Sequence, residues 1–280
     1  MRLQNFRVFY YSLLLGTSII WSCSTKQEVE PNPIPKSNFW STTFDRTNLL
    51  SASTVQIGEG NPSLPTIKVD TQTLYQTMDG FGYTLTGGSA YLIEKMDPAS
   101  RDKLIRELFG CGEGENCIAY LRISLGASDL SETFFTYDEM PAGQTDVALT
   151  RFNLSRDTLF LIPLLKRILA IHPELKIMAS PWTAPLWMKT NNQSVGGNLK
   201  AEYQASYAQY FVKYINAMRQ QGIEVDAVTV QNEPQHGGNN PSMVMSFTQQ
   251  ADFIKNHLGP AFKAASIDTK IVIWDHNCDN

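Results

Sequence analysis

The segment Val225-Asp-Ala-Val-Thr-Val-Gln-Asn-Glu-Pro234 decides the fold class of this chain. It is a short apolar, β-branched run that ends in an amide, a carboxylate and a proline, a pattern typical of a buried strand followed by a polar loop. Comparable runs begin at Ile118, Leu175 and Lys270, and another ends near Gly82. Together these runs predict parallel strands whose carboxyl ends share one edge, where α/β proteins carry their functional groups.

The segments between these runs have helical periodicity. Ser155 is expected to cap a helix with apolar residues at helical spacing. A tyrosine-rich stripe predicts a second helix over 203–218, and a third is expected over 251–262, interrupted by Gly259-Pro260. The alternation predicts an α/β fold, a (β/α)8 TIM barrel truncated after about five β/α units. An open doubly wound sheet is the alternative, since it needs no further strands.

The first 22 residues predict a lipoprotein signal peptide. Arg2 and Arg7 precede an apolar stretch that is too short to span a bilayer, and Cys23 follows at the position that receives lipid. We therefore expect an exported protein that is lipid-anchored to a bacterial membrane, at the outer membrane and cell surface or in the periplasm. A plain signal peptide or a signal anchor is the alternative.

Three further segments follow the signal peptide. Residues 23–38 contain three prolines and predict an extended tether. Residues 39–75 predict an N-terminal β segment, with strand-like alternation around Val55 and from Thr66 to Asp70. Residues 76–280 hold the strands and helices of the partial barrel.

The composition excludes several classes of function. The net charge of −4 over 280 residues, without a run of Lys or Arg, gives no support to nucleic-acid binding. The sequence has no zinc-ligand spacing, serine-hydrolase elbow or P-loop, so we expect no metal and no cofactor. Cys111 and Cys117 flank a short Gly-rich loop, and export would allow them to form a disulfide.

Chemically distinctive residues follow the predicted strands. Arg122 and Asp129 lie at the end of the second strand. In one interpretation they form a salt bridge, and in the other Asp129 binds sugar hydroxyls while Arg122 holds nearby carboxylates in place. Trp182 and Trp187 lie in a proline-stiffened loop, where their rings serve as a wall for a pyranose or pack in the core. Glu233 follows the fourth strand and is a candidate general acid for glycoside cleavage, which also requires a second carboxylate.

Taken together, these motifs resemble glycoside hydrolase family 30, which includes lysosomal glucosylceramidase. The resemblance covers the chain from about Gln76 to its end. It is carried by Gln76-Thr-Met-Asp-Gly-Phe-Gly82, Leu121-Arg-Ile-Ser-Leu-Gly-Ala-Ser-Asp-Leu-Ser131, Ala179-Ser-Pro-Trp-Thr-Ala-Pro-Leu-Trp-Met-Lys-Thr-Asn191 and Thr229-Val-Gln-Asn-Glu-Pro234. It implies a (β/α)8 barrel with a side β-sandwich, to which the N-terminal strands would belong, and retaining hydrolysis by double displacement.

The same resemblance suggests roles for individual residues. Glu233 matches the acid/base of the family, and Asn232 matches the asparagine before it. The remaining candidates for substrate binding are Arg122, Asp129, Trp182, Trp187 and His236. The nucleophile of the family is a glutamate at the end of strand seven, and the sequence ends before any such position.

The expected substrate is a carbohydrate. The segments 232–236, 239–243 and 274–277 are more similar to microbial β-1,6-glucanases than to ceramide-cleaving enzymes. We expect a hydrolase of β-glucosidic bonds, an endo-β-1,6-glucanase that acts on polysaccharide and meets a membrane only through its anchor. The alternatives are a glucosylceramidase, another β-glucosidase or β-xylosidase, and a catalytically incomplete glycan-binding protein.

Overall fold

The computed structural model describes residues 35–58, 60–61 and 63–278, so the predicted signal peptide and Cys23 lie outside it. The chain divides after Leu74 into two units. In the N-terminal unit, β1 (Lys36–Ser41) pairs antiparallel with β2 (Ser51–Gln56), and nearly all of their side chains are exposed. The strand expected from Thr66 to Asp70 is wrong: in the described residues this segment has no ladder partner, and alternation alone does not make a strand.

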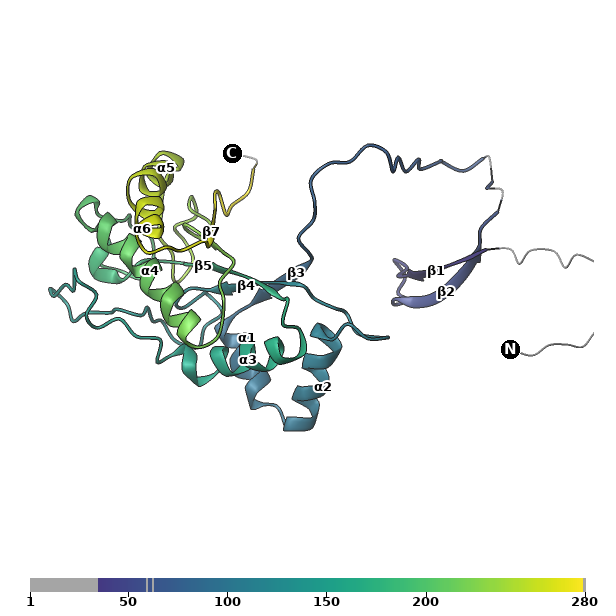
Figure 1. The fold of residues 1–280 in the computed structure, drawn as a ribbon, viewed down its shortest axis with the longest axis horizontal. Coiled ribbons are helices and arrows are strands. Elements are labelled where there is room, and N and C mark those ends of the chain that lie inside the picture. The colour runs from purple at the N-terminus through teal and green to yellow at the C-terminus, as the bar shows by residue number, and fades with distance from the viewer. Residues whose placement is uncertain (1–34, 59, 62, 279–280) are drawn as a thin grey trace, which may run out of the picture. The chain divides into compact units, whose positions relative to one another are not determined.

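The C-terminal unit is built on a parallel sheet of five strands in the order β3-β4-β5-β6-β7 (Figure 1). The strands are β3 (Gly82–Leu85), β4 (Tyr120–Ser124), β5 (Lys176–Ser180), β6 (Ala227–Thr229) and β7 (Lys270–Val272). Each strand pairs with the next one along the chain, which is the order of a (β/α) barrel. The predicted parallel α/β arrangement is therefore confirmed.

Backbone packing between β3 and β4 requires a glycine. A Cβ added at Gly82 would lie 1.4 Å from the carbonyl oxygen of Tyr120. Any side chain at this position would push the two strands apart. The second glycine of the Gly80-Phe-Gly82 motif is thus explained by strand pairing.

Helices connect the strands and cover the sheet. The α-helices are α1 (Gly87–Lys95), α2 (Pro98–Phe109), α3 (Leu161–Ile171), α4 (Gln204–Gln220), α5 (Phe247–Phe253) and α6 (Gly259–Ala264). Short 3₁₀ turns lie at Asp157–Leu159, Leu186–Met188 and Ala201–Tyr203. In Figure 1, α1, α2 and α3 lie together near β3 and β4, whereas α5 and α6 lie near β7.

Two helix boundaries differ from the predictions. Ser155 does not cap a helix, because its hydroxyl and its N–H both donate hydrogen bonds to Oδ1 of Asn153. The helix α3 begins only at Leu161. Gly259-Pro260 does not interrupt the third helix. A π-helical segment (Ile254–Leu258) joins α5 to α6 and leaves Pro260 in the first turn of α6, where a missing N–H is tolerated.

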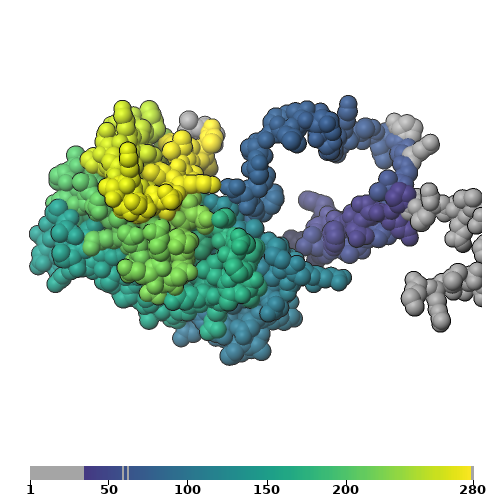
Figure 2. Space-filling model, viewed as in Figure 1, coloured from purple at the N-terminus to yellow at the C-terminus, as the bar shows by residue number. Residues whose placement is uncertain are grey.

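The core lies between the sheet and α3 and α4. The tyrosine stripe of α4 is fully buried, as core packing predicts, and Figure 2 shows the C-terminal unit as one packed body coloured from blue to yellow. The outer strands are less covered than the inner ones: Tyr83 on β3 and Val272 on β7 are 39% and 38% exposed. The sheet is open at both edges, as expected of part of a barrel. None of the helices among the described residues has the length and apolar character needed to cross a membrane.

Candidate active site

Polar side chains from four strands meet at the carboxyl edge of the sheet. Arg122 on β4 donates from Nη2 to Oδ1 of Asn232 at 2.8 Å and to Oδ2 of Asp275 at 2.6 Å. The same oxygen of Asp275 lies 2.7 Å from the hydroxyl of Ser180 and 2.8 Å from that of Thr229. We call Arg122, Ser180, Thr229, Asn232 and Asp275 the strand-end cluster. Parallel strands place these distant residues side by side because their carboxyl ends coincide.

Glu233 lies immediately beyond this cluster. Its backbone N–H donates to the carbonyl oxygen of Asp275 at 2.9 Å, and its φ of 42° is in the left-handed region, which is uncommon for a residue with a side chain. Its Oε2 accepts a hydrogen bond from Nδ2 of Asn239 at 2.7 Å. Strained backbone of this kind concentrates at functional sites. Glu233 is half-buried, so its side chain is accessible to a ligand bound at this edge.

Trp182 gives the cluster an aromatic neighbour. The guanidinium carbon of Arg122 lies 4.8 Å from the centroid of the Trp182 ring, a cation–π contact. The backbone of Trp182 is fixed as well, because Nε2 of Gln231 donates to its carbonyl oxygen at 2.7 Å. The structure therefore brings together four of the predicted site residues, namely Arg122, Trp182, Asn232 and Glu233.

The other predicted substrate-binding residues lie apart from the cluster or at its rim. Trp187 is packed in the apolar core, where its Nε1 donates to the carbonyl oxygen of Asp138 at 2.9 Å and its ring meets Tyr203 edge to face. Of its two interpretations, the structure shows the core-packing one. Asp129 is exposed beside the start of α1, and His236 is exposed in the loop after Glu233.

Several residues of this edge were not predicted. Ser180 and Thr229 are the last residues of β5 and β6, so the rule that functional groups follow strand ends could have found them. No local signal marks Asn239 or Lys189. Lys189 is buried, and its Nζ donates to the carbonyl oxygens of Gln193, Ser194 and Ser242, which ties the loop after β5 to the loop after β6 that carries Asn239. Burial lowers the pKa of Lys189 to about 8.

A disulfide joins Cys111 and Cys117. Together with His172, the two cysteines form a group whose ligand atoms lie within 4.8 Å of one another. Because both sulfur atoms are bonded to each other, neither is available as the thiolate that a metal would need.

A parallel sheet in which each strand pairs with the next one along the chain, with polar side chains at the carboxyl ends of its strands, is the arrangement of a (β/α) barrel. The family model described as "Glycosyl hydrolase family 30 TIM-barrel domain" matches residues 78–280. The chain belongs to this family. Its five strands are therefore part of a TIM barrel and not an open doubly wound sheet.

The chain is similar to several characterised proteins. It is 36% identical over 241 residues to the endo-1,6-beta-D-glucanase BGN16.3 of Trichoderma harzianum, and the matched region covers 79% of this chain and 48% of that protein. It is 30% identical over 276 residues to the lysosomal acid glucosylceramidase of Mus musculus, covering 92% and 52%. Among solved structures, the endo-beta1,6-glucanase BT3312 matches with a TM-score of 0.75 and 37% identity, covering 86% and 52%. The chain spans about half the length of the relatives that it matches.

Proposed function

We propose that the whole protein is a retaining glycoside hydrolase that cleaves β-1,6-glucosidic bonds within polysaccharide chains, with Glu233 as its general acid/base. The observation that carries this proposal is the position of Glu233, held at the carboxyl end of β6 by Asn239 and by the backbone of Asp275. Asn232 beside it accepts a hydrogen bond from Arg122, and the ring of Trp182 lies against the guanidinium of Arg122. Two of the most similar relatives described above are named endo-β-1,6-glucanases.

Retaining hydrolysis needs a second carboxylate about 5–5.5 Å from the first. An unpaired N–H of Arg122 indicates where this second carboxylate would lie. The Nε of Arg122 is buried and has no partner among the described residues, and a guanidinium N–H without an acceptor is costly. We propose that a carboxylate from chain beyond Asn280 accepts this hydrogen bond. Arg122 would then hold the nucleophile in place, while Trp182 and Asn232 position the sugar.

In this mechanism Glu233 first protonates the bridging oxygen as the second carboxylate attacks the anomeric carbon. The resulting glycosyl ester is hydrolysed when Glu233, now ionised, takes a proton from water. Asp129 would contact the sugar from the rim, together with His236 in the loop beside Glu233. The half-buried position of Glu233 is suited to both steps, since it is reached by substrate and by water.

The same proposal includes export and anchoring. The positive residues Arg2 and Arg7, the apolar stretch after them and Cys23 support a lipoprotein signal peptide. The disulfide between Cys111 and Cys117 also favours an oxidising compartment outside the cytoplasm. Polysaccharide is a substrate that an enzyme anchored outside the cell can reach.

Substitution of Glu233→Gln in the full chain tests the role of this residue. We expect kcat/KM on β-1,6-glucan to fall by about 10²–10⁴-fold, because the leaving oxygen is no longer protonated. An aryl β-glucoside with an acidic leaving group needs little protonation, so formation of the glycosyl-enzyme should be nearly unchanged. Glu224→Gln, an exposed control, should match the wild type. Equal losses on both substrates would show that Glu233 is not the acid.

Parallel assays on β-1,6-glucan, β-1,3-glucan and glucosylceramide test the choice of substrate. We expect β-1,6-glucan to be cleaved with the highest kcat/KM, into oligosaccharides of mixed length. Preference for glucosylceramide would place the protein with the glucosylceramidases, and binding of glucan without cleavage would support a glycan-binding protein.

A further inference from the structure

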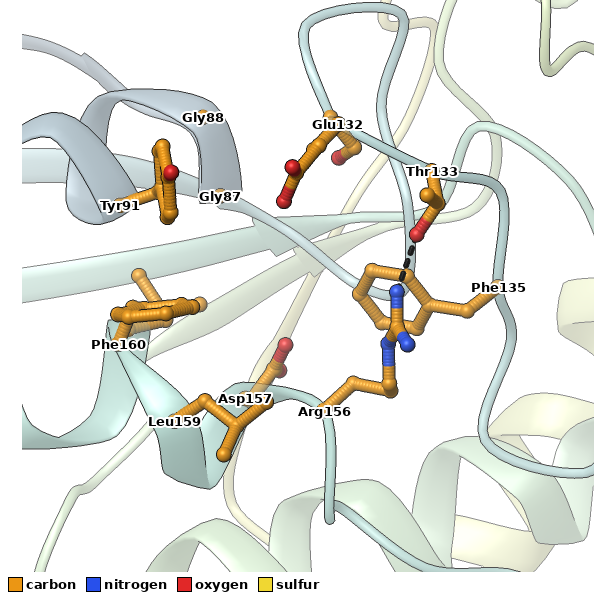
Figure 3. A pocket seen from close by; sticks show the side chains of 12 residues that line it. Gly87, Gly88, Tyr91, Glu132, Thr133, Phe135, Arg156, Asp157, Leu159 and Phe160 are labelled. Carbon is orange, nitrogen blue, oxygen red and sulfur yellow. Dashed lines mark hydrogen bonds between the residues drawn. The ribbon is translucent and has the colours of Figure 1, made fainter.

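A pocket of about 150 Å³ lies between the N-terminal ends of α1 and α3, apart from the strand-end cluster (Figure 3). Tyr91 on α1 and Phe160 at the start of α3 form one side, with their rings edge to face at 5.0 Å. Phe135 and Arg156 form the opposite side, where the guanidinium lies 5.2 Å from the ring centroid. A cavity of this volume, about 150 Å³, is known to hold one six-membered ring.

Polar groups close the pocket above and below. Figure 3 shows the carboxylate of Glu132 reaching into it from the loop after β4, and the carboxyl group of Asp157 pointing into it from the opposite side. Asp157 is 5% exposed, and one of its oxygens accepts a hydrogen bond from Tyr137. The carboxyl group lines the pocket, where a ligand hydroxyl can donate to it.

The charges in the pocket nearly cancel. Glu132 and Asp157 face Arg156, and Arg156 also donates to the hydroxyl of Thr133. A strongly charged ligand would leave one of these groups opposed by a like charge. A neutral ligand that carries hydroxyls on its edges and C–H groups on a flat face is complementary to all of them. In Figure 3 the Tyr91 ring is seen nearly edge-on, with one face turned toward Glu132. The flat face of the ligand can stack on this face of the ring.

The pocket adjoins a depression that contains one of the predicted substrate-binding residues. A second depression of about 470 Å³ includes Asp129 and shares Gly88, Tyr91, Ser131 and Glu132 with the pocket. A chain of linked sugars lying in both would pass by Asp129, which comes from the same loop after β4. The two depressions therefore form one path along the surface.

We propose that this pocket binds a glucosyl unit of the polysaccharide outside the catalytic site, with Tyr91 stacking on the pyranose and with Arg156, Glu132 and Asp157 contacting its hydroxyls. The inference rests on the proposed function, because it takes the ligand to be the same β-glucan. The pocket would hold the polymer on the enzyme without taking part in bond cleavage.

Substitutions in the full chain test this proposal. Tyr91→Ala and Arg156→Ala should each raise KM on soluble β-1,6-glucan by about tenfold, the change that ~1.4 kcal/mol of binding free energy produces. Neither should change kcat/KM on an aryl β-glucoside by more than about twofold, because a small substrate does not reach the pocket. Tyr91→Phe keeps the stacking face and should stay near the wild type. Tyr75→Ala and Arg106→Ala, which remove exposed side chains elsewhere, are the matched controls.

The outcomes separate this inference from the proposed function. An unchanged KM on glucan in both variants would show that the pocket does not bind the polymer. Equal losses of kcat/KM on glucan and on the aryl glucoside would contradict the proposal as well, since the residues would then act through the catalytic edge. If the wild type cleaves neither substrate, the proposed function fails. The pocket is then judged by retardation in gels that contain β-1,6-glucan: loss of retardation in the two variants supports it, and unchanged retardation refutes it.

Discussion

Two carboxyl groups of the C-terminal unit, Asp275 and Asp157, have very different surroundings. Asp275 lies at the strand-end cluster, where one oxygen is within hydrogen-bonding distance of Arg122, Ser180 and Thr229. Asp157 lies just before α3, and among the described residues its side chain accepts a hydrogen bond from the hydroxyl of Tyr137 alone, at 2.5 Å. Burial raises the pKa of Asp157 to about 7, and Tyr137 opposes this only in part.

The carboxyl edge of a parallel sheet collects polar groups from several strands. Each strand end delivers a new donor to the same place, so a carboxylate there acquires several partners, one of them a cation. Within the part of the chain that the structure describes, Asp157 has a single side-chain donor, the hydroxyl of Tyr137, and no strand ends meet around it. Its buried carboxyl group therefore stays protonated through much of the acidic pH range. The ring of Tyr137, the hydrogen-bond partner of Asp157, is itself stacked on Tyr210 and Tyr214.

The largest expected effect that tests this comparison is the pH dependence of stability caused by Asp157. Its folded pKa of about 7 lies above the unfolded value of 3.8, so the unfolded chain releases the proton first as pH rises. Stability should therefore fall between about pH 4 and pH 7, by up to ~4 kcal/mol for this group, and then level off. Asp157→Asn in the full chain should remove this part of the slope, measured by urea unfolding at several pH values.

Asp138 is the reason that some slope should remain. Burial raises its pKa to about 6, so it acts in the same direction as Asp157. Asp102→Asn, which changes an exposed carboxylate, should keep the full slope of the wild type. A wild-type protein whose stability rises between pH 4 and pH 7 would contradict the assignment for both buried carboxyl groups.

Arg122→Met should have the next largest effect. It removes the cation next to Asp275, so the carboxylate keeps the hydroxyls of Ser180 and Thr229 but has no opposite charge beside it. The loss should be about 3 kcal/mol of unfolding free energy at neutral pH. Arg106→Met, at an exposed arginine 4.0 Å from Glu115, should cost at most about 0.5 kcal/mol. Chemical denaturation at pH 7 compares the two, and similar small losses would mean that the cluster does not depend on its charge pair.

Tyr137→Phe is expected to cost about 2 kcal/mol. The hydroxyl of Tyr137 donates to Asp157 and accepts from the N–H of Gly126 at 2.9 Å, so both buried groups lose a partner. Tyr207→Phe is a matched control, because the buried hydroxyl of Tyr207 has no hydrogen-bond partner among the described residues. Its removal should be neutral or slightly stabilising. Equal losses for the two tyrosines would indicate that ring packing, not the hydroxyl, sets the cost.

The smallest effect is expected for Ser180→Ala. Asp275 keeps Arg122 and Thr229 as partners, so the loss should be near 1 kcal/mol. The control is Ser155→Ala, at an exposed serine whose hydroxyl meets only Asn153. If Ser180→Ala costs as much as Tyr137→Phe, the strand-end cluster lacks the redundancy inferred here.

The sequence predicted the parts of the site that follow directly from strand ends. Arg122, Trp182, Asn232 and Glu233 were found in this way, and the structure brings them together. Trp187 could not be distinguished from Trp182, because both follow the same strand and share the same loop. Both rings are buried, and only their partners differ: Trp182 lies against Arg122, whereas Trp187 packs against Tyr203 in the core.

The alternation of strand and helix, the parallel order and the position of Glu233 after the fourth strand follow from the sequence alone, because hydrophobic periodicity and the position of polar residues after each run are local properties. The contacts between side chains of different elements depend on tertiary packing. The joining of Asp275 to Arg122, of Asn239 to Glu233 and of Asp157 to Tyr137 depends on the register of strands and on loops that cross between them. These contacts link residues from separate elements, and their distances are set by packing, which no single segment contains.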